Sequence, residues 1–401
     1  MNTPGSIDTL IKQNLNQGVF TACSLTVYHK NRLRLNRAWG YIDPETCKIE
    51  VRTDTQFDIA SITKLFTVTA LLSILSQLEI EVDLNTPLVN VITEFGSRSP
   101  RPITGGQDPH TGIFSPVTQE LQGRTIDPAS VTLWHLLTHT SGLPPWRDVY
   151  NTVGNPPKPP AQIDEQAYRN RWKRALDALV SYDFFDVVGE HVHYSDLGIM
   201  LLGEVVARLD GNDLDKVIEK HICCPLRLTS TQFNPVLHGV SHESIVPTEY
   251  DGRWRNRRIW GEVHDENACG VGGVAGHAGL FSTAFDVAAF GQAWLTHDRG
   301  LKINDEFYHQ AIDEQVCDGS ERRGLGWMLK SEENSSAGNL LTMRTYGHTG
   351  FTGTSLWIDP EHQLVVSLMT NRVYSGRVKR GIHQFRRSLH DLIHEMTIAG
   401  G

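Results

Sequence analysis

A chain of 401 residues is long enough to bury a large hydrophobic core. Its hydrophobic fraction of 39% and charged fraction of 21% are typical of a globular protein and exclude a disordered chain. The net charge of −9, without any long run of Lys or Arg, argues against nucleic acid as the main partner.

The sequence also bears on where the protein works. Residues 1–19 contain no basic stretch leading into an apolar one, so no signal peptide is predicted. The most apolar segment, 65–78, is short and interrupted by Thr and Ser, which favours a buried helix over a membrane span. No C-x-x-C pair occurs among the six cysteines, which are Cys23, Cys47, Cys223, Cys224, Cys269 and Cys317. We therefore expect free thiols, a cytoplasmic location and no membrane partner.

The first predicted elements are a helix and a hairpin. Ser6 can cap a helix over about 7–15, where apolar residues recur at helical spacing. Two extended runs, 22–28 and 33–39, are separated by four turn-like residues and predict a β-hairpin. A long apolar helix is predicted to start near Ser61.

The middle of the chain is predicted to be mainly helical. Residues 96–127 and 144–163 are rich in Pro, Gly and polar residues, which indicates long surface loops. Helical periodicity appears over 129–142, 168–182, 197–210 and 213–221.

Strands are predicted again after residue 283. A helix starts near Thr283, where Asp286 three residues later gives a capping-box pattern. Strands are then predicted over 324–330, 344–349, 354–358 and 364–369. A basic amphipathic helix from about 376 to 397 closes the chain.

The order of these elements predicts an α/β (α+β) fold. Residues 1–60 and 284–401 would form an antiparallel sheet built from both chain ends and flanked by terminal helices. Residues 61–283 would form a large all-helical insertion with long loops. We expect 1–401 to be a single catalytic unit.

Ser61-Ile62-Thr63-Lys64 is the only Ser-x-x-Lys in the chain. Positions i and i+3 share a helix face, so the Ser61 hydroxyl and the Lys64 amine can meet. A serine needs a neighbouring base to become a nucleophile, and a buried lysine can be that base. In the first helical turn the Ser61 N–H is also available to an oxyanion.

Two further motifs follow. Tyr194-Ser195-Asp196 precedes the helix at 197, where either Ser195 or Asp196 could simply act as the cap. Gly347-His348-Thr349-Gly350 falls in a predicted strand, whereas a second copy of the last three residues, at 110–112, falls in a loop. The order of the motifs favours the later copy.

This set of motifs resembles the serine β-lactamase and penicillin-binding-protein family, including class C β-lactamases, DD-peptidases and related esterases. Those proteins carry Ser-x-x-Lys, then Tyr-x-Asn or a variant, then Lys- or His-Thr-Gly on a strand. Similarity extends over about residues 17–395 and includes the segments 136–144, 263–268 and 276–283.

The resemblance implies a role for each matching residue. Ser61 would be acylated, while Lys64 and Tyr194 would move its proton and later activate water. The N–H groups of Ser61 and Phe351 would form the oxyanion hole. Asp196, His348 and Thr349 would contact substrate, and Gly350 and Gly353 would let it lie along the strand.

Two departures from the family pattern bear on activity. Asp196 stands where the family usually has Asn. It could hold Lys64 and raise its pKa, or prefer a hydrogen-bond donor on the substrate. His348 stands where Lys is commoner, and a neutral imidazole attracts a carboxylate less than an ammonium does. Both argue for a weak β-lactamase at most.

Other chemistries have less support. Several of the 18 histidines are paired by sequence, at 135/139, 191/193 and 390/394, but H-E-x-x-H is absent. We therefore expect no metal and no cofactor. Gly270–Ala275 loosely fits a dinucleotide motif, although without a preceding strand we expect a flexible loop near the site. No G-x-S-x-G occurs.

The expected function is a serine hydrolase that cleaves an ester, amide or peptide through an acyl-serine. The partner is a small-molecule or peptide substrate. An acyltransferase using the same site, or a binding protein that keeps the fold without turnover, is the alternative.

Overall fold

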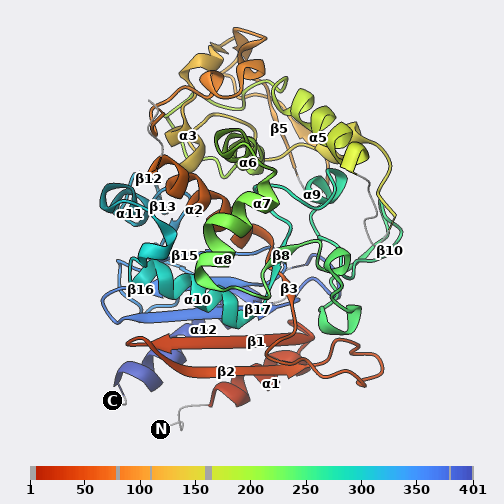
Figure 1. Ribbon diagram of the computed structural model, residues 1–401, viewed down its shortest axis with the longest axis vertical. Coiled ribbons are helices and arrows are strands. Elements are labelled where there is room, and N and C mark those ends of the chain that lie inside the picture. The colour runs from red at the N-terminus through yellow and green to blue at the C-terminus, as the bar shows by residue number, and fades with distance from the viewer. Residues whose placement is uncertain (1–5, 78–81, 109–110, 159–164, 379–380, 400–401) are drawn as a thin grey trace.

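The computed structural model describes residues 6–77, 82–108, 111–158, 165–378 and 381–399. Its main feature is an eight-stranded antiparallel sheet that confirms the predicted union of both chain ends (Figure 1). The strands lie in the order β12 (Val316–Asp318), β13 (Glu321–Arg323), β14 (Met328–Leu329), β15 (Tyr346–Thr349), β16 (Ser355–Asp359), β17 (Leu364–Thr370), β1 (Ala22–His29) and β2 (Arg32–Gly40).

The two ends of the chain meet where β1 pairs with β17. Leu25 lies opposite Leu368 in this antiparallel ladder. The predicted hairpin is also present, because β1 pairs with β2 across the two-residue turn Lys30-Asn31. Both turn residues have positive φ, 52° and 59°, as a tight hairpin turn requires.

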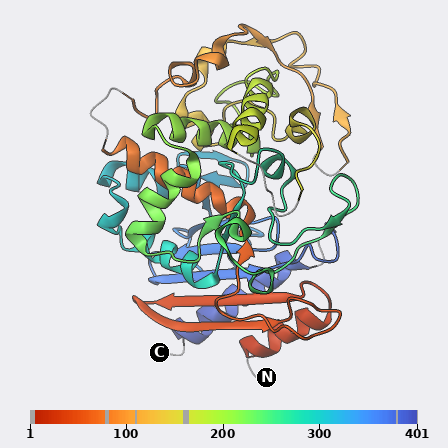
Figure 2. The same cartoon turned by 45° about the vertical axis from the view of Figure 1, so that its right-hand side comes forward.

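Helices cover both faces of the sheet. The terminal helices α1 (Ile7–Asn16) and α12 (Ile382–His394) pack on one face, and α10 (Ala284–Leu295) packs on the other. From a second angle, Figure 2 shows the middle of the sequence on the α10 side and both termini on the opposite side. The flanking terminal helices were predicted.

The apolar run of β17 is explained by burial on both faces. Val366 and Leu368 belong to the core under α1 and α12, whereas Val365 and Met369 belong to the larger core on the other side. Alternate residues of a strand point to opposite faces, so a strand between two helical layers needs apolar side chains throughout.

The middle of the chain forms the helical part. Its central helix α2 is buried along its whole length and packs against α6. The helices of this part are α2 (Thr63–Leu75), α3 (Leu133–Leu137), α4 (Val149–Val153), α5 (Glu165–Leu179), α6 (Asp196–Asp210), α7 (Leu214–Ile218), α8 (Cys224–Leu226) and α9 (Glu266–Gly270).

An all-helical insertion had been expected. The structure differs, because short β-strands pair with one another in this part of the chain. One three-stranded sheet joins β3 to β11 and β8, and three two-stranded sheets pair β4 with β7, β5 with β6 and β9 with β10. The bounds are β3 (Phe57–Asp58), β4 (Arg101–Pro102), β5 (Gly106–Gln107), β6 (Phe114–Ser115), β7 (Thr125–Ile126), β8 (Gln232–Phe233), β9 (Tyr250–Asp251), β10 (Arg257–Arg258) and β11 (Leu280–Ser282). Such two- and three-residue strands carry too little periodicity to be predicted.

Some boundaries also differ from the predictions. Thr283 caps α10 as expected, but the Asp286 carboxylate accepts bonds from Ser230 N and Thr231 Oγ1 instead of completing a capping box. The last helix begins at Ile382 and not near 376, and part of that difference, 379–380, lies outside the described residues. Helix α11 (Asp305–Ile312) was not predicted.

Two further properties concern the cysteines and the length of the helices. All six cysteines are free thiols in the structure. Within the described ranges, no helix combines the length and apolar character needed to cross a bilayer.

Candidate active site

Ser61 is presented by a strained turn at the start of α2. It follows β3, and Ala60 just before it has a φ of +47°, a conformation that costs energy for a residue with a side chain. The buried Asp58 carboxylate holds this turn by accepting hydrogen bonds from Ala60 N at 2.8 Å and His264 N at 2.6 Å. The strand and this carboxylate together fix the position of Ser61.

Ser61 and Lys64 meet as the Ser-x-x-Lys spacing predicts. Lys64 is 1% exposed, and its Nζ lies 2.9 Å from Ser61 Oγ. The same ammonium donates to the carbonyl oxygen of His277 at 3.1 Å. A buried amine held by two oxygen atoms has a fixed direction toward the serine hydroxyl.

Tyr194 enters from the segment before α6. Its ring centroid lies 4.9 Å from Lys64 Nζ, and its side chain interacts with both Lys64 and Ser61. The buried His139 supports this segment by accepting a hydrogen bond from Ser195 N at 3.1 Å, and its ring lies 4.7 Å from that of Tyr194. His139, one of the paired histidines, is therefore part of the support of the site.

The structure separates the roles of Ser195 and Asp196. Ser195 is the N-cap of α6, with its Oγ accepting from Gly198 N at 3.1 Å. The Asp196 carboxylate instead forms an ion pair with Lys64 at 2.8 Å. Asp196 is thus free of the capping role and belongs to the charge arrangement around Ser61.

The charges around Lys64 oppose its use as a base at neutral pH. Burial favours the neutral amine, but the charge of Asp196 and the neighbouring Tyr194 outweigh it and raise the pKa of Lys64 above its ordinary value. The pKa of Tyr194 is also raised, mainly by burial and further by Asp196, although Lys64 opposes this. The resting site therefore holds an ammonium, a carboxylate and a neutral phenol.

His348, Thr349 and Gly350 lie at the end of β15, on the other side of Ser61. Burial, reinforced by the charges of Lys64 and Arg323, holds the pKa of His348 well below its usual range, so the imidazole is neutral. Its Nδ1 donates to Thr349 O at 2.8 Å, which leaves Nε2 as an acceptor. The other His-Thr-Gly copy begins at His110, outside the described residues.

The turn after β15 brings Phe351 to Ser61. Thr352 Oγ1 donates to Asp58 O at 2.8 Å, and Thr354 Oγ1 donates to Ile59 O at 3.0 Å. Both bonds tie the turn to the residues just before Ser61. Ser61 and Phe351 consequently line the same cavities, which suits the pairing of their N–H groups that the resemblance implies.

Gly350 and Gly353 are also needed for packing within the protein. A Cβ at Gly350 would meet Thr354 Oγ1 at 2.1 Å and Ile59 O at 2.7 Å. Gly353 has a φ of +116°, and a Cβ there would meet Thr370 Oγ1 at 2.1 Å. Packing within the protein therefore already requires both glycines, whether or not substrate lies along the strand.

Two cavities meet at Ser61, Tyr194 and Phe351. The first, here called the acidic cavity, has a volume of about 340 Å³ and is lined by Ala60, Ser61, Pro145, Trp146, Tyr194, Asp196, His264, Asp265, Glu266, His277, Ala278, Phe351 and Arg377. The second, here called the arginine cavity, measures about 620 Å³ and includes His348, Thr349 and Gly350 with Arg323, Arg372 and Arg386. A substrate bound at Ser61 can extend into both.

Arg323 on β13 is the least satisfied cation of the arginine cavity. It is 4% exposed and pairs with Glu321 at 2.7 Å through Nη2. Its Nε and Nη1 have no hydrogen-bond partner among the described residues. Two buried, unpaired donors beside Ser61 suit an anionic ligand.

Sequence reasoning missed Arg323, Asp265 and His277. Arg323 lies on a three-residue strand too short to predict, and no motif contains it. Asp265 and His277 fall inside family-like segments, so those segments were the available signal. The described residues contain no group of three or more His, Cys, Asp or Glu placed to hold a metal ion. The Gly270–Ala275 segment is buried, with Gly270 ending α9, and is not an exposed loop.

Comparison with known sequences agrees with the family resemblance of the motifs. The sequence model of the family described as Beta-lactamase matches residues 7–390. A protein of Escherichia coli O157:H7, provisionally named a D-alanyl-D-alanine carboxypeptidase, is 28% identical over 393 residues, covering 92% of this chain and 82% of its own. A protein of the same name from Salmonella agona (strain SL483) is 28% identical over 396 residues, with the same two coverages.

Solved structures show the same fold at low identity. EstCE1, described as a hydrolase with promiscuous acyltransferase activity, is 19% identical and aligns with a TM-score of 0.69 over 96% of this chain and 97% of its own. Unliganded simvastatin synthase (LovD) from Aspergillus terreus is 17% identical, with a TM-score of 0.68 and 98% of each chain covered. The octameric penicillin-binding protein homologue from Pyrococcus abyssi is 18% identical, with a TM-score of 0.65, and 97% of this chain and 76% of that one are covered.

Proposed function

Since the chain belongs to the beta-lactamase family, we propose that it is a serine hydrolase in which Ser61 forms an acyl-enzyme with an ester, amide or peptide substrate. The observation that carries this proposal is the contact of Lys64 Nζ with Ser61 Oγ at 2.9 Å inside a buried pocket. A lysine that stabilised the fold alone would not need to point at a partly exposed serine between two cavities.

The proposed reaction begins with loss of a proton from Lys64. The neutral amine, or Tyr194 acting with it, then accepts the Ser61 proton while Oγ attacks the substrate carbonyl. The N–H groups of Ser61 and Phe351 stabilise the negative oxygen of the tetrahedral intermediate. Tyr194 returns the proton to the leaving group, and water repeats the sequence to release the acyl group. Over one turnover the Ser61 proton departs with the leaving group, and a proton from the hydrolytic water restores the Ser61 hydroxyl.

The arginine cavity supports a substrate that carries a carboxylate. Three arginines and two glutamates line it, and Arg323 offers two buried, unpaired donors. Neutral His348, with an acceptor at Nε2, is poorly suited to hold a carboxylate. We therefore propose small peptides with a free C-terminus, such as D-amino-acid peptides or muropeptide fragments, as substrates. The carboxypeptidase name of the E. coli relative fits this proposal.

Acyl transfer is a second candidate, because two cavities meet at one serine. One cavity can hold the acyl group while the other admits an acceptor in place of water. EstCE1 is described as having promiscuous acyltransferase activity, which makes this variant worth measuring beside hydrolysis.

Fast β-lactam hydrolysis has less support, since Lys64 is held protonated and His348 is neutral. A cytoplasmic site of action stays a proposal.

A substrate panel tests the proposed function. Purified protein would be incubated with esters, D-peptides and muramyl amides, with and without an added amine or alcohol acceptor. We expect release of a D-amino acid or alcohol and an acyl adduct on Ser61 in trapped reactions. Binding of these compounds without any adduct or product would instead support the alternative, a binding protein that keeps the fold.

A further inference from the structure

The acidic cavity carries an excess of negative charge next to Ser61. Its described lining residues include three carboxylates, Asp196, Asp265 and Glu266, and one permanent cation, Arg377. Lys64, which pairs with Asp196, is not part of the lining. Arg377 forms ion pairs with both Glu266 and Glu249. Glu249 does not line the cavity, and its carboxylate also contacts His264. The lining therefore carries more carboxylates than permanent cations, which favours a positively charged group in the cavity.

His277 adds a buried acceptor that no group in the described chain satisfies. It lines the cavity, is 1% exposed, and its Nε2 pairs with Asp265 at 2.9 Å. Its Nδ1 has no hydrogen-bond partner among the described residues. When Nε2 carries the ring's single hydrogen and donates it to Asp265, Nδ1 can accept a hydrogen bond. A ligand that brings hydrogen-bond donors and positive charge fits both features.

The remaining walls suit a cation as well. Trp146 lines the cavity with an aromatic ring, and ring faces attract ammonium groups. The rings of Tyr194 and Phe351 already lie against Lys64 and Arg372 of the protein itself. The acidic residues are therefore part of an enclosed site and not a solvated surface cluster. Asp265 and Glu266 are 24% and 16% exposed, so their carboxylates are available within the cavity.

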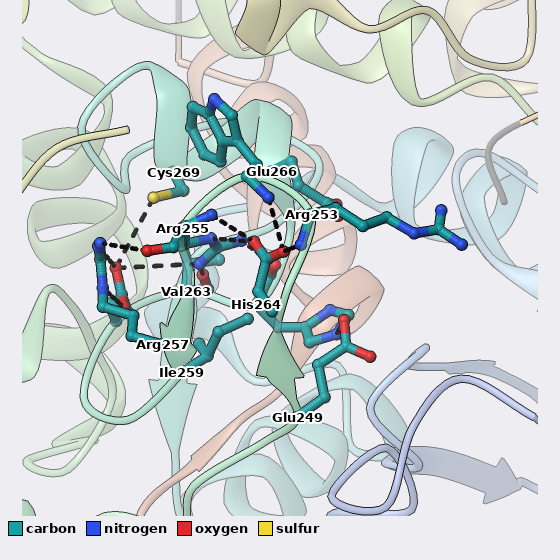
Figure 3. Close-up of polar contacts among 12 residues, drawn as sticks. Glu249, Arg253, Arg255, Arg257, Ile259, Val263, His264, Glu266 and Cys269 are labelled. Carbon is teal, nitrogen blue, oxygen red and sulfur yellow. Dashed lines mark hydrogen bonds and ion pairs between the residues drawn. The ribbon is translucent and has the colours of Figure 1, made fainter. Parts of the chain in front are cut away.

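The segment that carries Asp265 and Glu266 is held in place before any ligand binds. The fully buried Arg255 donates to the carbonyl oxygens of Val263 and His264, as Figure 3 shows. Arg255 also pairs with Asp251. Figure 3 also shows Glu249 beside His264, whose Nε2 it contacts at 3.0 Å. This network fixes the backbone that leads directly into Asp265 and Glu266. A pre-organised site loses little entropy when a ligand binds.

We propose that the acidic cavity binds an ammonium group of the substrate. This inference rests on the proposed function and narrows its substrate class to compounds with a free amine on one side of the scissile bond. With a carboxylate in the arginine cavity, the preferred substrate is zwitterionic, as a short peptide with both ends free is. Asp196, Asp265, Glu266 and His277 Nδ1 are the groups that receive the ammonium hydrogens.

Matched analogues test this directly. Alanine p-nitroanilide is compared with isobutyryl p-nitroanilide, in which a methyl group replaces the ammonium on the acyl side of the scissile bond. In a second pair of substrates, a methyl group replaces an ammonium on the leaving-group side. Calorimetric titration of alaninamide and isobutyramide measures binding without turnover. Glu266→Gln removes a charge from the cavity, and Glu243→Gln removes one from an exposed site elsewhere as the control.

We expect at least one ammonium compound to be preferred about tenfold or more in kcat/KM, and alaninamide to bind more tightly than isobutyramide. Glu266→Gln should lose most of this preference, whereas Glu243→Gln should keep it. Equal use and equal binding of the ammonium and methyl compounds by the wild-type protein would overturn the inference. Turnover of the neutral compounds, or labelling of Ser61 by a fluorophosphonate, would then show that the proposed hydrolase itself stands.

Discussion

Asp196 Oδ1 lies 2.8 Å from Lys64 Nζ, and the same ammonium lies 2.9 Å from Ser61 Oγ. One carboxylate therefore holds the proton on the group that is proposed to activate the nucleophile. Related enzymes usually place an uncharged amide at this position, so the charge state of Lys64 is the property in which this site should differ most.

The first prediction concerns the pH dependence of the reaction. Asp196 raises the pKa of Lys64, so the neutral base appears only as the pH rises. Asp196→Asn removes the charge and keeps the size, so the rising limb of kcat/KM should move to lower pH by about one unit or more, roughly 1.4 kcal/mol per unit. Asp177→Asn, on the exposed surface of α5, is the control. An identical profile in the Asp196 variant would show that Asp196 does not set the charge of Lys64.

The second prediction concerns Tyr194. Tyr194→Phe removes the hydroxyl and keeps the ring packed against His139 and Lys64. We expect kcat/KM to fall by about 10²–10⁴-fold, the usual contribution of a general acid or base, with the melting temperature nearly unchanged. Tyr250→Phe, at an exposed tyrosine, should have normal kinetics. Full activity of Tyr194→Phe would leave Lys64 as the only proton carrier.

These predictions also indicate how far the sequence alone reaches. Local spacing was sufficient for the contact of Ser61 with Lys64 and for the hairpin of β1 and β2, because each depends on neighbouring residues. The apolar run at 364–369 predicted the strand β17, whereas its burial on both faces was found only in the structure. Arg323, Asp265 and His277 reach the site only through tertiary packing of very short elements. The packing requirement at Gly350 likewise depends on Ile59, almost 300 residues away.

The third prediction concerns recognition of the carboxylate. Arg323→Gln should raise KM for substrates with a free C-terminus by about 10- to 100-fold, as expected for loss of charged hydrogen bonds worth about 1.5–3 kcal/mol. Carboxamide analogues of the same substrates should be affected little. Arg322→Gln, at the preceding residue of β13, serves as the control. An equal loss with both kinds of substrate would mean that Arg323 acts through Tyr194, whose ring its guanidinium approaches to 5.3 Å.

The fourth prediction concerns β-lactams. Penicillins and nitrocefin should acylate Ser61 slowly, and hydrolysis should be far below the median enzyme turnover of about 10 s⁻¹. The physical reason is that protonated Lys64 is a poor base for the deacylating water and neutral His348 attracts the drug carboxylate weakly. Nitrocefin absorbance and intact mass measure the two steps separately. Rapid nitrocefin turnover would contradict this interpretation of Asp196 and His348.

The most direct test of the account is covalent labelling of Ser61. Intact-mass spectrometry after treatment with a fluorophosphonate should show one adduct per wild-type chain, and peptide mapping should place it on Ser61. Ser61→Ala should show no adduct and no turnover, with an unchanged circular dichroism spectrum and melting temperature. An adduct on another serine or on a cysteine, or retained turnover in Ser61→Ala, would contradict the proposal that this chain acts through an acyl-serine at Ser61.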